Sequence, residues 1–170
     1  CLVRYFSLSG NNTDGKTWAT AWNTLANLNA YWLNLRNSAN YDGMNIVYVS
    51  ADSFNFADAA LCSLYADNTW LIGAGDKSQG RPASIWYKMV VQGDADTVGD
   101  DRDLIRIFGD NCHILNMTLC AFDTVGDPDP SGLTGGNNAI TFDTITGGIQ
   151  GGEVGYCYFP PPNHKPLQMH

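Results

Sequence analysis

The feature that most limits the fold of this chain is a long succession of short β-type runs. After residue 43, runs rich in β-branched and aromatic residues recur, and glycine, asparagine and aspartate separate them. These three residue types tolerate the left-handed backbone angles that tight turns require. The pattern therefore predicts a β-rich chain with many turns. The predicted strands are residues 46–49, 70–72, 85–91, 104–108, 113–115, 117–119, 140–142 and 154–159.

One segment near the start has a helical pattern instead. A short predicted strand at residues 4–9 and a cluster of turn formers at 10–15 precede it. Apolar residues then recur at spacings of three and four up to about Arg36, which predicts one apolar helical face. Thr17 is the predicted N-cap, because its hydroxyl can accept a backbone N–H. The apolar positions are Trp18, Ala21, Trp22, Leu25, Leu28, Trp32 and Leu35.

Two stretches, residues 105–122 and 139–159, resemble successive copies of one unit. Each has a strand, a turn with glycine, an isolated isoleucine (Ile114 or Ile149) and a strand that ends in Cys-x-Phe. A repeat on this scale is typical of a solenoid, in which each unit buries one face on its neighbours. The sequence therefore predicts stacked units.

The charge of the chain limits its partners. Lys and Arg number nine against 17 acidic residues, for a net charge of −8. Nucleic-acid binding and attraction to an anionic membrane surface both need clustered basic residues, so neither is expected. No stretch approaches the roughly 20 apolar residues of a membrane-spanning helix. Divalent cations and neutral sugars remain compatible with this acidic surface.

The cysteines number five, which is odd, and they form no CxxC pair. Buried free thiols are the favoured interpretation, and one disulfide between Cys120 and Cys157 is the alternative. Because the chain starts at Cys1 rather than methionine, we expect a fragment of a longer chain or a processed form. The five are Cys1, Cys62, Cys112, Cys120 and Cys157.

The opening of the chain resembles a known family. Residues 9–11 (Ser-Gly-Asn), 15–18 (Gly-Lys-Thr-Trp) and 21–25 (Ala-Trp-Asn-Thr-Leu) look like the start of right-handed β-helices of the pectate-lyase-like superfamily. Residues 42–49 stand where that family begins its first coil, in altered form. The resemblance covers about residues 4–50 well and the rest only in style.

The resemblance implies an all-β fold, a right-handed parallel β-helix (solenoid) with an N-terminal amphipathic capping helix. Such a helix would cover the open edge of the first coil, which otherwise invites aggregation. The alternative is an α+β domain with one helix on an antiparallel sheet. The expected single domain, 1–170, divides into an opening strand and turn (1–16), the capping helix (17–36), coils (44–159) and a Pro-rich tail (160–170).

The family includes polysaccharide lyases and hydrolases, adhesins, and fibres, spikes and decoration proteins of phage virions. Its opening motif occurs in catalytic and non-catalytic members, so it carries no chemistry. Our leading hypothesis is a non-catalytic structural protein on a virion surface or outside the cell, with other virion or surface proteins, a second copy or a glycan as partners. Alternatives are a secreted polysaccharide lyase or glycoside hydrolase, or a carbohydrate-binding adhesin module.

One acidic cluster is the candidate metal site. Carboxylate oxygens suit a hard cation such as Ca²⁺, although the spacing is not that of an EF-hand loop. A solvated turn is the favoured interpretation of the same residues. An enzyme would need this cluster to converge with Arg102 or Lys88 on one groove. The candidate ligands are Asp94, Asp96, Asp100 and Asp101.

The remaining chemical candidates are interpreted as structural. His113 follows Cys112, and neighbouring strand residues face opposite sides, so the two do not form a nucleophile–base pair. Most of the five Trp, eight Tyr and seven Phe are expected in the core or the end cap. An adhesin would instead require a row of exposed aromatics. Loop or tail positions are expected for Asp123, Asp127, Asp129, His164 and His170.

Overall fold

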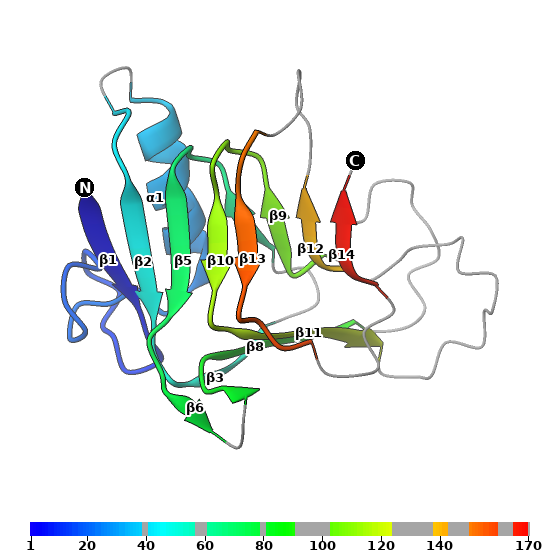
Figure 1. The fold of residues 1–170 in the computed structure, drawn as a ribbon. Helices are drawn as coiled ribbons and strands as arrows, with labels where there is room; N and C mark the ends of the chain where they lie inside the picture. Colours follow the sequence, from blue (N-terminus) through cyan, green and yellow to red (C-terminus); the bar gives the residue numbers. More distant parts are fainter. Residues whose placement is uncertain are drawn as a thin grey trace.

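The computed structural model describes residues 1–38, 41–56, 61–78, 81–90, 103–123, 138–142, 150–159 and 165–169. Within these ranges the chain is mostly β: its strands form mainly parallel sheets, and one short helix, α1 (Leu25–Arg36), lies near the start of the chain (Figure 1). None of the helical residues described forms a segment long and apolar enough to cross a membrane. The many strands and the single short helix of the described residues confirm the predicted all-β class.

Three parallel sheets, named A, B and C here, make up the fold. Sheet A contains, in spatial order, β1 (Leu2–Phe6), β2 (Asn45–Val49), β5 (Thr69–Gly73), β10 (His113–Leu115) and β13 (Glu153–Gly155). Sheet B contains β3 (Ser53–Phe56), β8 (Ile85–Val90) and β11 (Thr118–Asp123). Sheet C contains β4 (Cys62–Leu64), β9 (Ile105–Ile107), β12 (Asn138–Phe142) and β14 (Lys165–Met169). An antiparallel pair, β6 (Lys77–Ser78) and β7 (Arg81–Pro82), joins β5 to β8.

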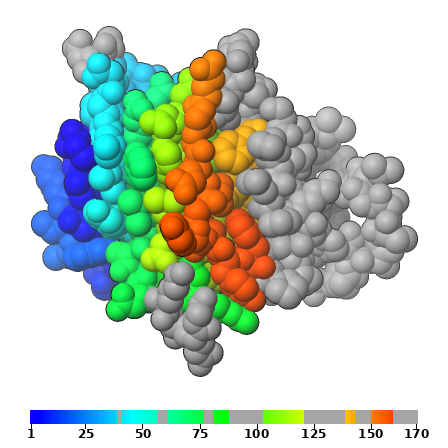
Figure 2. Space-filling view, in the orientation of Figure 1, coloured from blue at the N-terminus to red at the C-terminus, as the bar shows by residue number. Residues whose placement is uncertain are grey.

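The chain visits the three sheets in a fixed order. We call one passage through A, B and C a round: β2, β3 and β4 form the first, β5, β8 and β9 the second, and β10, β11 and β12 the third. Each strand pairs in parallel with the matching strand of the next round. Figure 2 shows the sheet A strands as adjacent stripes from blue to orange. The antiparallel α+β alternative is therefore wrong.

Side chains alternate between the interior and the outside along each strand. In β2 and β5 the first, third and fifth residues are buried, as the two-residue period of a strand requires. Val47 pairs with Leu71, and Leu71 pairs with Ile114, all fully buried. Successive rounds thus stack like side chains on one another and form a continuous core.

Aspartates hold the turn that leads from sheet C back to sheet A. The backbone N–H of Asp110 donates to Asp67 Oδ1 at 2.8 Å, and the N–H of Gln150 donates to Asp110 Oδ1 at 2.7 Å. Each carboxylate therefore satisfies a backbone donor of the next round, one of the roles that favour aspartate in turns.

The next position in the same turn has a left-handed backbone. Asn68 and Asn111 both have φ of +53°, and Gly151 has φ of +70° in the following round. The Asn111 amide donates to Asn68 Oδ1 at 2.8 Å. Asparagine and glycine occupy this position because they adopt positive φ at low cost.

Helix α1 lies beside β4, the edge strand of sheet C. It buries Leu25, Leu28 and Trp32, which belong to the predicted apolar stripe. The Asn29 amide donates to Leu61 O at 2.7 Å and accepts the Ser63 N–H at 2.8 Å. The Asn29 side chain thus bonds two backbone groups at the edge of sheet C that a further strand would otherwise bond.

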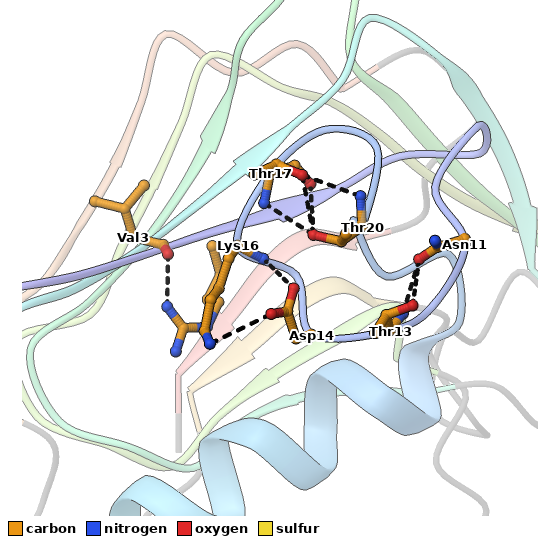
Figure 3. A network of polar contacts seen from close by, with 8 residues as sticks. Val3, Asn11, Thr13, Asp14, Lys16, Thr17 and Thr20 are labelled. Atoms are coloured by element: carbon orange, nitrogen blue, oxygen red, sulfur yellow. Dashed lines mark hydrogen bonds and ion pairs between the residues drawn. The ribbon is translucent and has the colours of Figure 1, made fainter.

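The predicted start of the helix at Thr17 is wrong, because α1 begins at Leu25 after the N-cap Thr24. Thr17 does accept the Thr20 N–H, at 3.2 Å, but within a single turn (Figure 3). Trp22 then pairs with β1: its N–H donates to Tyr5 O at 3.1 Å. The extended backbone of this pairing excludes a helix through Trp22.

The two predicted copies do pair, but in a different alignment. Ile140 lies opposite Ile105. Val154 lies opposite Ile114, a position that the similarity of the two copies would give to Ile149. Inward-facing side chains set the register, and sequence similarity between turns does not reveal it. Part of the predicted Pro-rich tail (residues 160–170) forms a strand instead, because β14 pairs with β12. His164 and His170, at its two ends, lie outside the described residues.

Candidate functional site

The predicted calcium site falls outside the described part of the chain, so it stays a prediction. Its four aspartates are Asp94, Asp96, Asp100 and Asp101. The same holds for Arg102, Asp127 and Asp129, while only the backbone of Lys88 and Asp123 is described. Asp123 ends β11 and pairs with Val90, so the loop position predicted for it is wrong. In the ranges that the structure covers, no group of three or more His, Cys, Asp or Glu side chains could hold a metal ion.

Cys112 and His113 face different environments, as the strand argument predicted. The Cys112 thiol is fully buried, and burial raises its pKa to about 12. The His113 ring stacks on Trp70, with centroids 3.8 Å apart, and its Nε2 lies 2.9 Å from Asn111 Oδ1. His113 Nδ1 lies 3.7 Å from Glu153 Oε2, an ion pair only when the ring is protonated. The two residues therefore do not form a nucleophile–base pair.

All five cysteines are free thiols, so the alternative of a Cys120–Cys157 disulfide is wrong. Burial raises the pKa of the Cys120 thiol to about 11 and also raises the pKa values of Cys62 and Cys157. A thiol held protonated is a poor nucleophile and a poor metal ligand. The buried thiols of Cys62, Cys112 and Cys120 act as small apolar groups in the core.

The outer face of sheet A is mostly apolar. We call this surface face A, and it is viewed from the front in Figure 2. Its members are the outward residues of four neighbouring strands, placed side by side by the parallel register. They are Val3, Tyr5, Ile46, Tyr48, Trp70, Ile72, His113 and Leu115.

Three aromatic rings form a row at the β1 end of face A. The Tyr5 ring lies 4.6 Å from Trp18 and 6.0 Å from Tyr48, measured between centroids. Trp18 leaves 41% of its surface exposed, and the interplanar angles are 56° and 30°. The rings thus offer partly exposed apolar surfaces with polar groups at their edges, which can stack on a sugar ring.

The outer face of sheet C is polar instead. Arg106 pairs in register with Ser63 on one side and Thr141 on the other. Its Nε and Nη2 lie 3.1 and 2.9 Å from Asp103 Oδ2, and Asp103 is only 4% exposed. This carboxylate balances the guanidinium charge within the fold.

Comparison with known proteins identifies no relative. The chain matches no protein-family model, no curated protein and no solved structure at a significant level. The resemblance of residues 4–50 to pectate-lyase-like β-helices is therefore neither supported nor opposed by these comparisons.

The sequence did not single out the aromatic row. Tyr5 and Tyr48 occur in predicted strands, in which side chains alternate between the two faces. This alternation places both tyrosines outside only once it is known which of their neighbours face inward. The predicted helical face includes Trp18, but the helix begins only at Leu25. The missing information was the register between β1 and β2, which brings Tyr5 opposite Tyr48.

Proposed function

We propose that this chain folds as a right-handed parallel β-helix and serves as a non-catalytic structural component of a virion surface, as a decoration, spike or fibre protein. The observation that carries the proposal is the fixed order of sheets A, B and C through three successive rounds. A right-handed path is expected because connections between parallel strands of one sheet are right-handed in about 98% of cases.

The role of the carboxylates supports a structural function. Asp67 and Asp110 accept backbone N–H groups of the following round. Asp52 accepts the Leu8 N–H and the Ser7 hydroxyl, both at 3.2 Å. These groups stabilise the connections between strands. The virion assignment itself follows from the family that the opening residues resemble and is an analogy.

The test is the location of the native protein. We expect mass spectrometry of purified particles to recover the chain in fixed stoichiometry with known particle proteins. Recovery only from the secreted soluble fraction would overturn the virion role. Polysaccharide cleavage with and without Ca²⁺ would then test the enzyme alternative, for which Asp94, Asp96, Asp100 and Asp101 are the candidate cation ligands.

The second candidate is a carbohydrate-binding adhesin module, favoured by the row Trp18, Tyr5 and Tyr48 on face A. Glycan-array binding that is lost in Tyr48→Ala and kept in Tyr87→Ala would support it. Tyr87 is a matched control because it is a partly exposed tyrosine on β8, in sheet B. Equal binding by both variants would count against face A.

A further inference from the structure

A pocket of about 620 Å³ opens between the start of α1, the end of β3 and β4. This volume is within the usual range of small-molecule sites, roughly 300–1,000 Å³. The pocket is separate from face A, because its walls come from α1 and from sheets B and C. Nothing in the proposed structural role requires it.

Two aromatic residues that line the pocket, Tyr65 and Phe56, pack against further rings. The Tyr65 ring stacks on Phe108 with centroids 5.0 Å apart and an interplanar angle of 14°. Phe56 packs edge-on against Trp86 at 5.2 Å. These contacts hold both rings in place before any ligand arrives, so binding would cost little side-chain entropy.

The pocket is also lined by neutral polar groups, those of Asn55 and Thr24. Asn55 lies on β3 with an exposed side chain, and within the described residues its amide makes no hydrogen bond. Thr24 is the N-cap residue of α1, and its hydroxyl makes no capping hydrogen bond. Both groups can donate and accept hydrogen bonds.

One further lining residue, Asn29, already has a role in the fold. Asn29 lines the pocket, and its amide bonds the backbone of Leu61 and Ser63. It therefore holds β4 in place and is not a suitable residue to mutate when binding is tested.

We infer that this pocket binds one unit of a neutral saccharide. Amide and hydroxyl groups match the hydroxyls of a sugar, and an aromatic ring in the lining matches its apolar face. Among the described residues, the lining contains no lysine, arginine or histidine to pair with an anion and no carboxylate to bind a cation. The net charge of −8 further disfavours anionic ligands.

The experiment is an NMR titration of the ¹⁵N-labelled full chain with glucose, galactose and N-acetylglucosamine, with glucuronate as the charged probe. We expect saturable shifts at Thr24, Ala26, Asn55 and Tyr65 with at least one neutral sugar, and weaker binding of glucuronate. Asn55→Ala is expected to raise the Kd about 3- to 10-fold, the loss of about one net hydrogen bond.

Two further variants complete the design. Tyr65→Leu removes the stacking ring and should weaken binding, while Asn34→Ala, an exposed asparagine on α1 outside the pocket, should leave the Kd unchanged. Native-like spectra of each variant establish that it folds. The inference is overturned if no neutral sugar gives saturable shifts, if Asn55→Ala and Tyr65→Leu bind as the parent does, or if glucuronate binds as tightly. These outcomes do not depend on whether the protein is found on particles.

Discussion

Gly73 shows how closely successive rounds approach one another. A Cβ placed on Gly73 would lie 1.9 Å from the backbone oxygen of Asn116 and 2.9 Å from Ser84 Cβ. The Asn116 amide also donates to Gly73 O at 2.8 Å, which fixes the two segments together. Because the nearest atom belongs to the backbone, the clash cannot be relieved by a side-chain rotation.

We therefore expect Gly73→Ala to lower the free energy of unfolding by at least about 2 kcal/mol. Urea denaturation measures the change. The control is Gly43→Ala, where the nearest atom to an added Cβ is Tyr41 Cε2 at 3.4 Å. An unchanged midpoint for Gly73→Ala would show that the rounds are less tightly apposed than described.

Cys112 makes stability depend on pH in the alkaline range. Burial raises the pKa of this thiol from 9.0 to about 12, so the folded chain keeps its proton where the unfolded chain loses it. The stabilisation is complete below about pH 9 and is lost as the pH rises toward 12.

Between pH 8 and pH 10 this thiol should lower the free energy of unfolding by about 1 kcal/mol. Urea denaturation at both values should show a smaller pH-dependent loss in Cys112→Ala than in the parent chain. Cys1→Ala, at an exposed position, is the control and should keep the parental loss. An identical loss in Cys112→Ala would contradict the burial of this group.

At the scale of elements, α1 protects the edge of sheet C, and its Asn29 side chain contributes directly to this protection. An exposed strand edge presents unpaired backbone groups to other chains. Asn29 satisfies one donor and one acceptor of this edge, at Ser63 and Leu61. The helix thus acts through specific hydrogen bonds as well as through burial of Leu25, Leu28 and Trp32.

Asn29→Ala is expected to lower the free energy of unfolding by about 2 kcal/mol, because two net hydrogen bonds are lost. It should also speed aggregation at moderate urea, which light scattering would detect. Asn34→Ala on the exposed side of the same helix is the matched control. Equal free energies of unfolding for the two variants would contradict the proposed contribution of the Asn29 amide to stability.

At the scale of the whole molecule, one aromatic cluster joins the opening strand to the first two rounds. Trp86 of β8 lies 5.3 Å from Phe6 of β1 and 6.1 Å from Phe54 of β3, between ring centroids. Trp86 is fully buried, and its indole Nε1 has no hydrogen-bond partner in the described chain. Apolar contact therefore accounts for its contribution.

Trp86→Ala should cost about 3–5 kcal/mol of unfolding free energy, from lost burial and the cavity left behind. Trp86→Phe should cost markedly less, because it keeps a ring and removes the unpaired N–H. Trp18→Ala, at a position 41% exposed, is the control and should cost under about 1 kcal/mol. Denaturation followed by circular dichroism separates these cases; similar costs for Trp86→Ala and Trp18→Ala would contradict the described core.

The sequence alone predicted the positions of most strands and the existence of one helix. Strand and turn signals are local: Ile46 to Val49 alternate in burial, and Asn68 and Asn111 adopt the positive φ that favours asparagine. It missed β3, β4, β6, β7 and β14. Of these, β3 and β4 are short and contain Ser53, Asn55 and Ser63. Polar residues at these positions weaken the strand signal, and pairing with neighbouring rounds overrides it.

Only the tertiary structure decided which segments meet. Trp22 fits a helical stripe, yet its backbone pairs with β1, and the helix starts after it. Val154 lies opposite Ile114, and Tyr5 lies opposite Tyr48, through registers set by long-range packing. The aromatic row and the pocket beside α1 both depend on such pairings. Backbone preferences are encoded by adjacent residues, whereas a surface is assembled from residues of different rounds.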